Sequence, residues 1–362
     1  MTGLSSRRRV SRPTASRHEM DLPKSVLVGD GVIKELGGFL KNLGCRGTVH
    51  IISGPHVMLM AREVVEEALK NEGFAFRWSN IGSVEIDSSK VTGDCASEQD
   101  GIILGLGGGR TVDIAKIVAF SSGHPFISIP TSASHDGISS PFASIKGSGK
   151  PYSIVTRSPL GIIADIDIIS NAPFRLLASG CGDLIGKVTA IKDWELARDD
   201  IGEYFGKYSA SLARLSADIV IKGAEDIGRR KKESYRDVVE ALISAGVAAG
   251  IAGTSRPCSG SEHLFAHALD VIGANKGLHG EKVGLGTILM AELHGVGWEN
   301  IVKALECIGS PTRAKDIGLS DEDTVKAFVH AGEIRPDRYT ILNKVKVDES
   351  KARSIARMTN VI

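Results

Sequence analysis

Three histidines close together in the sequence have side chains suited to binding a metal ion. His263 and His267 are four residues apart, so an α-helix would place both imidazoles on one face, and His279 follows after a glycine-containing connection. Imidazoles gathered in this way can hold a divalent metal, which can polarise a carbonyl group. The spacing leaves open whether His263 and His267 form a ligand pair, and Asp183 is a candidate for a further ligand.

Two loops earlier in the chain are typical of a site for a phosphorylated ligand. Glycines from Gly105 to Gly109 lie between a predicted strand and a helix predicted from Val112, where free N–H groups favour a pyrophosphate. The segment Pro130–Gly137, with its hydroxyls and Asp136, follows another predicted strand. Each loop alone could be a turn without a ligand. Two such loops at the carboxyl ends of strands favour a dinucleotide site.

Composition excludes several classes of protein. Lys and Arg number 44 against 43 Asp and Glu, which gives no support for nucleic acid or a membrane surface as the main partner. The uncharged stretch Ala241–Ser255 has 15 residues, fewer than the roughly 20 that a membrane-spanning helix needs. The five cysteines form no CxxC pair, so we expect reduced thiols and a cytoplasmic location.

Hydrophobic periodicity predicts two domains of different texture. Short apolar segments bounded by Gly or Pro predict parallel strands at Ser25–Val28, Thr48–Ile52, Gly101–Leu106 and Phe126–Ile129. Amphipathic segments between them predict helices at Ile33–Asn42, Val57–Asn71 and Val112–Phe120. After Pro173 helical periods dominate: Arg175–Trp194, Tyr204–Ile227, Arg236–Ala252, His263–Val271 and Gly284–Leu293.

These patterns predict an α/β protein with an N-terminal Rossmann-like parallel sheet and a C-terminal all-helical domain, with the active site in the cleft between them. We expect a dinucleotide-binding domain over residues 21–172 and a metal and substrate domain over 173–362. Residues 1–20, rich in Arg and without an apolar run, are expected to be a disordered basic tail. The segment 146–150 is expected to form a hairpin turn.

Four motifs in order along the chain resemble archaeal glycerol-1-phosphate dehydrogenases, which belong with glycerol dehydrogenase, iron-type alcohol dehydrogenases and dehydroquinate synthase. The motifs are GGGRTVD from Gly107, PTSASHDG from Pro130, SGSEHLFAHALD from Ser259 and HGEK from His279. The resemblance extends from about Pro23 to the C-terminus and leaves out the basic tail.

The resemblance implies a role for each motif. Asp183, His263 and His279 would hold one Zn²⁺ with an open position, whereas His267 would contact substrate in place of metal. Asp136, Asp183 and His267 would bind substrate, with Asp136 and His267 as the catalytic pair. The residues implied to contact NAD(H) or NADP(H) are Gly107, Gly108, Gly109, Arg110, Thr111, Val112, Asp113, Thr131, Ser132, Ala133, Ser134 and Ser140.

The implied reaction is reduction of dihydroxyacetone phosphate to sn-glycerol 1-phosphate, which supplies the glycerol backbone of archaeal ether lipids. Zinc would polarise the ketone and the nicotinamide would deliver hydride. We expect a proton relay through His267, because imidazole titrates near neutrality. The second predicted strand ends at Ser53 without an acid to bind a ribose hydroxyl, so we expect use of both NADH and NADPH.

Other functions stay open on the sequence alone. A glycerol dehydrogenase would share the fold, metal and cofactor but lack a phosphate-binding group; a dehydroquinate-synthase-like lyase or a non-catalytic binding protein are further alternatives. Lys187, Arg256 and Lys282 are the nearby candidates for binding the substrate phosphate. Beyond its small-molecule substrate, we expect the protein to associate with copies of itself, without nucleic acid and without stable membrane insertion.

Overall fold

The structure is a computed structural model that describes residues 18–82, 100–145 and 152–362. The chain divides into two compact units. The first contains the described residues up to Ala133 with Gly137–Ile145 and Ser153–Pro173; the second contains Ser134–Asp136, Tyr152 and Phe174–Ile362. The predicted tail up to residue 17 and the predicted turn at 146–150 lie outside the described residues.

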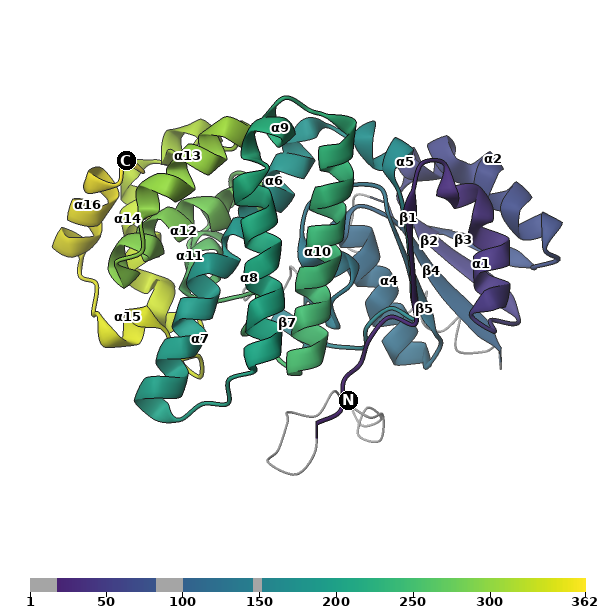
Figure 1. Cartoon of the computed structure of the whole chain (residues 1–362), viewed down its shortest axis with the longest axis horizontal. Helices are drawn as coiled ribbons and strands as arrows, with labels where there is room; N and C mark the ends of the chain where they lie inside the picture. The colour runs from purple at the N-terminus through teal and green to yellow at the C-terminus, as the bar shows by residue number, and fades with distance from the viewer. Residues whose placement is uncertain (1–17, 83–99, 146–151) are drawn as a thin grey trace. The chain divides into compact units, whose positions relative to one another are not determined.

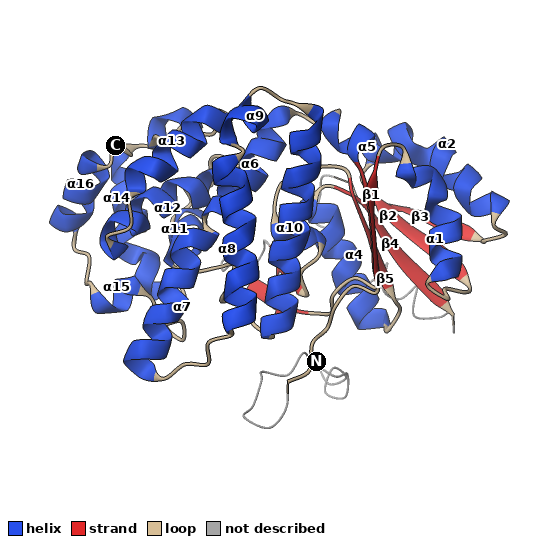
Figure 2. Ribbon diagram, viewed as in Figure 1, coloured by secondary structure: helices blue, strands red, loops and turns tan. Residues whose placement is uncertain are grey.

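The first unit is built on a parallel six-stranded sheet (Figure 2). Its order is β1-β8-β5-β4-β2-β3. The strands are β1 Ser25–Gly29, β2 Thr48–Ser53, β3 Phe76–Asn80, β4 Gly101–Gly107, β5 Phe126–Pro130 and β8 Gly161–Asp165. The strands β6 Phe142–Ile145 and β7 Tyr152–Val155, on either side of the undescribed turn, form a separate two-stranded sheet.

Helices cover both faces of the six-stranded sheet, as parallel strands buried on both sides require. One face packs against η1 Val32–Glu35, α1 Leu36–Asn42 and α2 Pro55–Asn71 through one apolar cluster (Figure 1). The other face packs against α4 Gly109–Ser122 through a second cluster that includes Val112, Val118 and Ile103. The short elements of this unit are η2 Asp136–Ile138, whose first residue lies in the second unit, and α5 Ile166–Ser170.

The second unit is helical apart from its connections. Its longer helices are α6 Phe174–Ile185, α7 Lys187–Ile201, α8 Lys207–Lys222, α10 Lys232–Ala252, α11 Ser261–Val271, α12 His279–His294, α13 Trp298–Ile308, α14 Asp321–His330 and α16 Glu349–Met358. The shorter ones are α9 Ala224–Gly228, η3 Ala314–Ile317, η4 Ala331–Glu333 and α15 Ile341–Lys344. The predicted combination of a parallel α/β unit and a helical unit is confirmed.

The sequence missed two strands and joined helices that are separate. β3 is an edge strand with polar residues, and β8 is a short buried strand of five residues between β1 and β5. The segment predicted as one helix from Arg175 is broken at Gly186 into α6 and α7, where a Cβ would lie 2.7 Å from Val283 Cγ1. Close packing against α12 therefore requires glycine at this position.

Membrane insertion and thiol state can be compared with the described residues. In the part of the chain that the structure describes, no helix has both the length and the apolar character needed to cross a bilayer. Cys45, Cys181, Cys258 and Cys307 are free thiols. The cytoplasmic location remains a prediction.

Candidate metal centre and nucleotide loops

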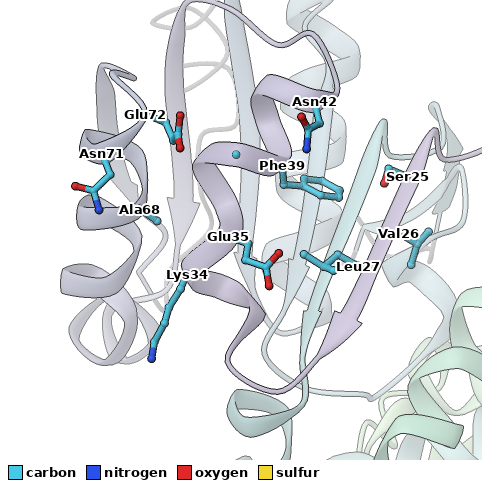
Figure 3. Close-up of a pocket in the computed structure, with 11 residues that line it drawn as sticks. Ser25, Val26, Leu27, Lys34, Glu35, Phe39, Asn42, Ala68, Asn71 and Glu72 are labelled. Atoms are coloured by element: carbon cyan, nitrogen blue, oxygen red, sulfur yellow. The ribbon is translucent and has the colours of Figure 1, made fainter.

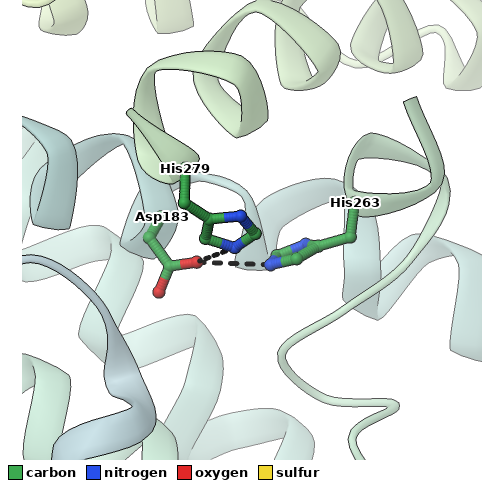
Figure 4. Close-up of side chains that lie close together, drawn as sticks. All are labelled: Asp183, His263 and His279. Carbon is green, nitrogen blue, oxygen red and sulfur yellow. Dashed lines mark hydrogen bonds and ion pairs between the residues drawn. The ribbon is translucent and has the colours of Figure 1, made fainter. Parts of the chain in front are cut away.

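Helices α6, α11 and α12 bring Asp183, His263 and His279 together. One ligand atom from each residue lies within 4.8 Å of the other two (Figure 4). Asp183 Oδ1 lies 3.2 Å from His263 Nε2 and 3.7 Å from His279 Nε2. A carboxylate and two imidazoles form a donor set that suits Zn²⁺, and three protein ligands leave a position open for substrate.

Glycines allow two of these helices to approach closely at the centre. Gly182, next to Asp183 in α6, faces Gly280, next to His279 in α12: a Cβ on Gly182 would lie 2.3 Å from the Gly280 carbonyl oxygen. A Cβ on Gly280 would lie 1.7 Å from the carbonyl oxygen of Ser179. The Gly280 N–H also donates to Ser179 Oγ at 3.1 Å. The distance between Asp183 and His279 is therefore set by main-chain contact.

A buried glutamate that the sequence analysis did not single out orients His263. Glu262 is fully buried, and its Oε1 lies 2.7 Å from His263 Nδ1. The same carboxylate accepts from Gly260 N–H and from the Thr189 hydroxyl. A carboxylate that accepts from Nδ1 leaves Nε2 directed at Asp183, the arrangement common around metal-binding histidines. Because Glu262 directly precedes His263 in the sequence, this adjacency could have indicated a carboxylate partner for the histidine.

Lys187 joins the two aspartates of the site. Its Nζ lies 2.8 Å from Asp136 Oδ2 and 3.0 Å from Asp183 Oδ2. The Asp136 backbone N–H also donates to Asp183 Oδ2. Burial alone would lower the pKa of Lys187, but the two carboxylates outweigh it and raise that pKa well above its usual range. Lys187 therefore remains a cation and holds Asp136 beside Asp183.

The surroundings shift the pKa values of the three histidines in different directions although their rings are neighbours. Burial opposes protonation of His263, but hydrogen bonds to Asp183 and Glu262 raise its pKa to about 9. Burial, followed by the charge of His263, lowers the pKa of His267 to about 3. The same two causes lower the pKa of His279 well below its usual range. These causes favour the neutral form of His267 at pH 7, and the expected proton relay through His267 stays a prediction.

His267 lies outside the group of converging ligand atoms. Its ring centroid is 6.5 Å from that of His263 and 6.2 Å from that of His279, and His263 and His279 are 5.2 Å apart. The group of ligand atoms contains His279 and Asp183 with His263, and does not contain His267. The geometry favours the set implied by the family resemblance over the pair implied by helical spacing.

The two predicted nucleotide loops start side by side in the first unit. β4 and β5 are neighbours, Gly107 is in register with Pro130, and the Thr131 N–H donates to the Gly107 carbonyl at 3.0 Å. The strand extends to Gly107 and α4 already begins at Gly109, so the glycines form a sharp turn with Gly108 as the N-cap. An N-cap without a side chain leaves the first N–H groups of α4 open to a pyrophosphate.

Several residues expected to contact the dinucleotide have buried side chains. Thr111, Val112 and Asp113 are at most 7% exposed, and Ala133 is 1% exposed. Asp113 Oδ2 accepts from the Ser144 N–H at 3.1 Å, which ties α4 to β6. Lys116, also in α4, donates to the carbonyls of Gly137 and Phe142. Arg110 is exposed. Among these positions, buried side chains position the loops and the main chain is left for contact.

Thr131, Ser132 and Ser140 are also buried, at 7%, 5% and 4% exposed, whereas Ser134 is half-buried. The Ser140 hydroxyl lies 3.3 Å from the Phe142 carbonyl oxygen and 3.3 Å from the Phe142 N–H. Ser132 Oγ is 3.4 Å from where a Cβ on Gly108 would lie, so the two loops meet at this point.

A separate pocket in the first unit contains none of the predicted site residues. It has a volume of about 480 Å³ and lies beside β1, α1 and α2 (Figure 3). It is lined by Ser25, Val26, Leu27, Lys34, Glu35, Gly38, Phe39, Asn42, Ala68, Asn71 and Glu72. These residues hold no cluster of metal-binding or nucleophilic side chains, so the chemistry belongs to the centre around Asp183.

Comparison with known proteins shows which family the chain is similar to. Residues 27–173 match the family model described as iron-containing alcohol dehydrogenase. The chain is 49% identical over 346 residues to the glycerol-1-phosphate dehydrogenase [NAD(P)+] of Nitrosopumilus maritimus, covering 95% of this chain and 97% of that protein. It is 50% identical over 345 residues to the enzyme of that name from Cenarchaeum symbiosum, with the same coverage. The crystal structure of glycerol dehydrogenase from Schizosaccharomyces pombe has a TM-score of 0.78 at 22% identity, covering 95% of this chain and 90% of that one, and shows the same fold.

Proposed function

The chain belongs to the glycerol-1-phosphate dehydrogenase family, and we propose that it reduces dihydroxyacetone phosphate to sn-glycerol 1-phosphate with Asp183, His263 and His279 as zinc ligands. The convergence of these three ligand atoms is the observation that carries the proposal. The product would supply the glycerol backbone of archaeal ether lipids. When bound, zinc supplies Lewis-acid polarisation of the substrate ketone and NAD(P)H supplies the hydride.

The chain's own residues prepare the site for this reaction. Glu262 fixes the ring of His263, and Lys187 compensates the charges of Asp136 and Asp183. Such fixed, buried groups do not have to reorganise when charge develops in the transition state. Asp136, whose side chain is 19% exposed, is the carboxylate that we assign to a hydroxyl group of the substrate.

We assign His267 a narrower role than the relay expected from the sequence. Its lowered pKa favours the neutral imidazole at pH 7, which offers one N–H donor and one acceptor nitrogen but lacks the acidic proton of an imidazolium. We assign it to orienting a substrate hydroxyl or a water that delivers the proton. His267→Ala should lower kcat, and His267→Gln, which keeps a donor and an acceptor, should restore part of it. An unchanged kcat and pH profile in His267→Ala would remove this residue from the mechanism.

The backbone of the Gly107–Gly109 turn and the Thr131–Ser134 loop is assigned to the dinucleotide. An N-cap without a side chain at the start of α4 supports the pyrophosphate position. The end of β2 at Ser53 carries no acid that would repel a 2′-phosphate, which supports use of both NADH and NADPH. Self-association and the cytoplasmic location stay predictions.

The test is oxidation of NADH by zinc-loaded protein with dihydroxyacetone phosphate and dihydroxyacetone compared side by side. We expect strong preference for the phosphate, a product with the sn-glycerol 1-phosphate configuration, and loss of activity on chelation that added zinc reverses. Equal or better use of dihydroxyacetone would replace the proposal with a glycerol dehydrogenase. Full activity after complete metal removal would reject the zinc assignment.

A further inference from the structure

The cations that the sequence suggests for the substrate phosphate are already matched by carboxylates. Lys187 lies between Asp136 and Asp183. The other two candidates are also paired: Arg256 with Glu203, and Lys282 with Asp270. A phosphate dianion would compete with an existing carboxylate at each of them. The group that recognises it must therefore be sought elsewhere in the helical unit.

Arg338, in the turn before α15, is a buried cation of a different kind. It is 6% exposed, and it donates to the Ser259 carbonyl and, at 2.7 Å, to Ser255 Oγ. Both partners are uncharged. Within the described ranges, no carboxylate oxygen lies within 4.0 Å of its guanidinium nitrogens, whereas its neighbours Arg256 and Arg335 pair with Glu203 and Asp337.

A buried charge without a counterion is unfavourable, and the surroundings of Arg338 disfavour its charged form further. Burial, followed by the charges of Arg335 and Arg256, lowers the pKa of Arg338 to about 9. The nearby acids Glu262 and Glu203 raise this pKa only in part. Glu262 is engaged by His263 and Thr189, and Glu203 by Arg256. Charged groups buried in proteins are usually paired or bind a ligand of opposite charge. Arg338 has the features of a group whose partner arrives from outside.

Its position relates it to the metal centre. Arg338 bonds to Ser259, two residues before α11 begins, and His263 is in the first turn of that helix. Arg338 is also one of the charges that lower the pKa of His267, after burial, His263 and Lys282. Arg338 therefore lies beside the start of the helix that carries His263.

We propose that the guanidinium of Arg338 binds the phosphate group of the substrate and selects dihydroxyacetone phosphate over dihydroxyacetone. In this substrate the phosphate ester is on the carbon next to the ketone, so binding the phosphate restricts where the ketone can lie. The planar fork of arginine suits two phosphate oxygens. This inference rests on the proposed function, which leaves the phosphate-binding group unassigned.

The test measures the inhibition constant of inorganic phosphate against dihydroxyacetone phosphate, with zinc-loaded protein and saturating NADH. Saturation keeps phosphate out of the dinucleotide loops. Arg338→Met should raise both this constant and the KM for dihydroxyacetone phosphate by roughly 10- to 100-fold and leave the KM for NADH unchanged. Arg338→Lys keeps the charge but not the planar fork, so its inhibition constant and KM should lie between those of the parent protein and those of Arg338→Met.

Arg256→Met is the matched control, because Arg256 is buried near the same turn and its charge is paired with Glu203. It should lower the unfolding temperature while its inhibition constant for phosphate stays close to that of the parent protein. A folded Arg338→Met protein with the parent constant would overturn the proposal. If that variant does not fold, an unchanged constant in Arg338→Lys would overturn it.

Failure of the proposed function gives a different result. If the parent protein does not reduce dihydroxyacetone phosphate, the proposed function is rejected. Phosphate binding at Arg338 would then be tested without turnover. Inorganic phosphate should raise the unfolding temperature of the NADH-saturated parent and not that of Arg338→Met. Equal protection of both proteins would reject the site.

Discussion

The two regions proposed to bind ligands are built from different parts of the chain. At the turn between β4 and α4 the main chain is presented and the nearby side chains of Thr111, Val112 and Asp113 are buried. Around Asp183 the side chains themselves converge from three helices. A site made of main chain depends on positions that have no side chain. A site made of side chains depends on how their charges compensate one another.

This difference predicts where each region is vulnerable. Removing a charged group from the centre leaves its buried partners uncompensated, and such losses cost several kcal/mol. Adding a methyl group to the turn should lower only the affinity for the ligand that must approach the main chain there. Substitutions in the two regions should therefore separate metal binding from dinucleotide binding.

The largest effect is expected for Asp183→Ala. It removes a zinc ligand and leaves His263 and Lys187 without a shared acceptor. We expect kcat/KM to fall by about 10³-fold or more and the free energy of unfolding to fall by about 3 kcal/mol. Metal analysis and urea unfolding measure the two effects. Asp183→Asn, which keeps the shape, should fold better and remain inactive; retention of one zinc per chain in Asp183→Ala would contradict the ligand assignment.

Glu262→Gln should have a smaller effect on the same centre. The amide can present its N–H group to His263 Nδ1 and so favour the wrong ring orientation or tautomer. We expect the zinc dissociation constant to rise by about 10- to 100-fold. Competition with a chromophoric chelator measures it, and the KM for NADH is the internal control. An unchanged zinc affinity would limit Glu262 to packing and capping.

Gly108→Ala tests the other region. The nearest atom to its added Cβ is Ser132 Oγ at 3.4 Å, so the fold should accept the methyl group. We expect the dissociation constant for NADH to rise about tenfold because the pyrophosphate can no longer approach the main chain. Fluorescence titration measures it. Unchanged NADH affinity, with unchanged stability, would place the dinucleotide elsewhere; zinc content should be the same as in the parent.

The smallest effect is expected for Ser261→Ala. Its hydroxyl is buried without a hydrogen-bond partner among the described residues, although the residue lies in the first turn of α11. Removing an unsatisfied hydroxyl should change the free energy of unfolding by no more than about 0.5 kcal/mol. Ser128→Ala in β5, also unsatisfied, is the matching change in the first unit. A loss of more than about 2 kcal/mol in either would indicate a bound water or ligand at that hydroxyl.

The sequence predicted the parallel sheet and the convergence of three ligands more successfully than the details of either. Apolar strands such as β2 and β5 were found because uninterrupted burial leaves a clear pattern. β3 was missed because an edge strand need not be apolar. The choice between His267 and His279 as ligand depended on family resemblance, since helical spacing cannot show where a distant helix begins.

Charge relations at the site were beyond what the sequence could predict. Lys187 is four residues from Asp183, but its second partner, Asp136, belongs to a loop far away in the chain. The pKa of His267 depends on burial and on the charge of His263, neither of which local sequence determines. Arg338 lies 75 positions beyond His263 (338 − 263), in a turn without any recognisable motif.

The contact between Gly182 and Gly280 has a consequence for how this enzyme tolerates sequence change. Main chain touches main chain there, so no side chain acts as a spacer between the helices that carry Asp183 and His279. Substitutions that enlarge or shrink the surrounding hydrophobic core would then alter stability before they alter the spacing of these two residues. The spacing of the two proposed ligands should therefore survive changes in the surrounding core, provided that both glycines are kept.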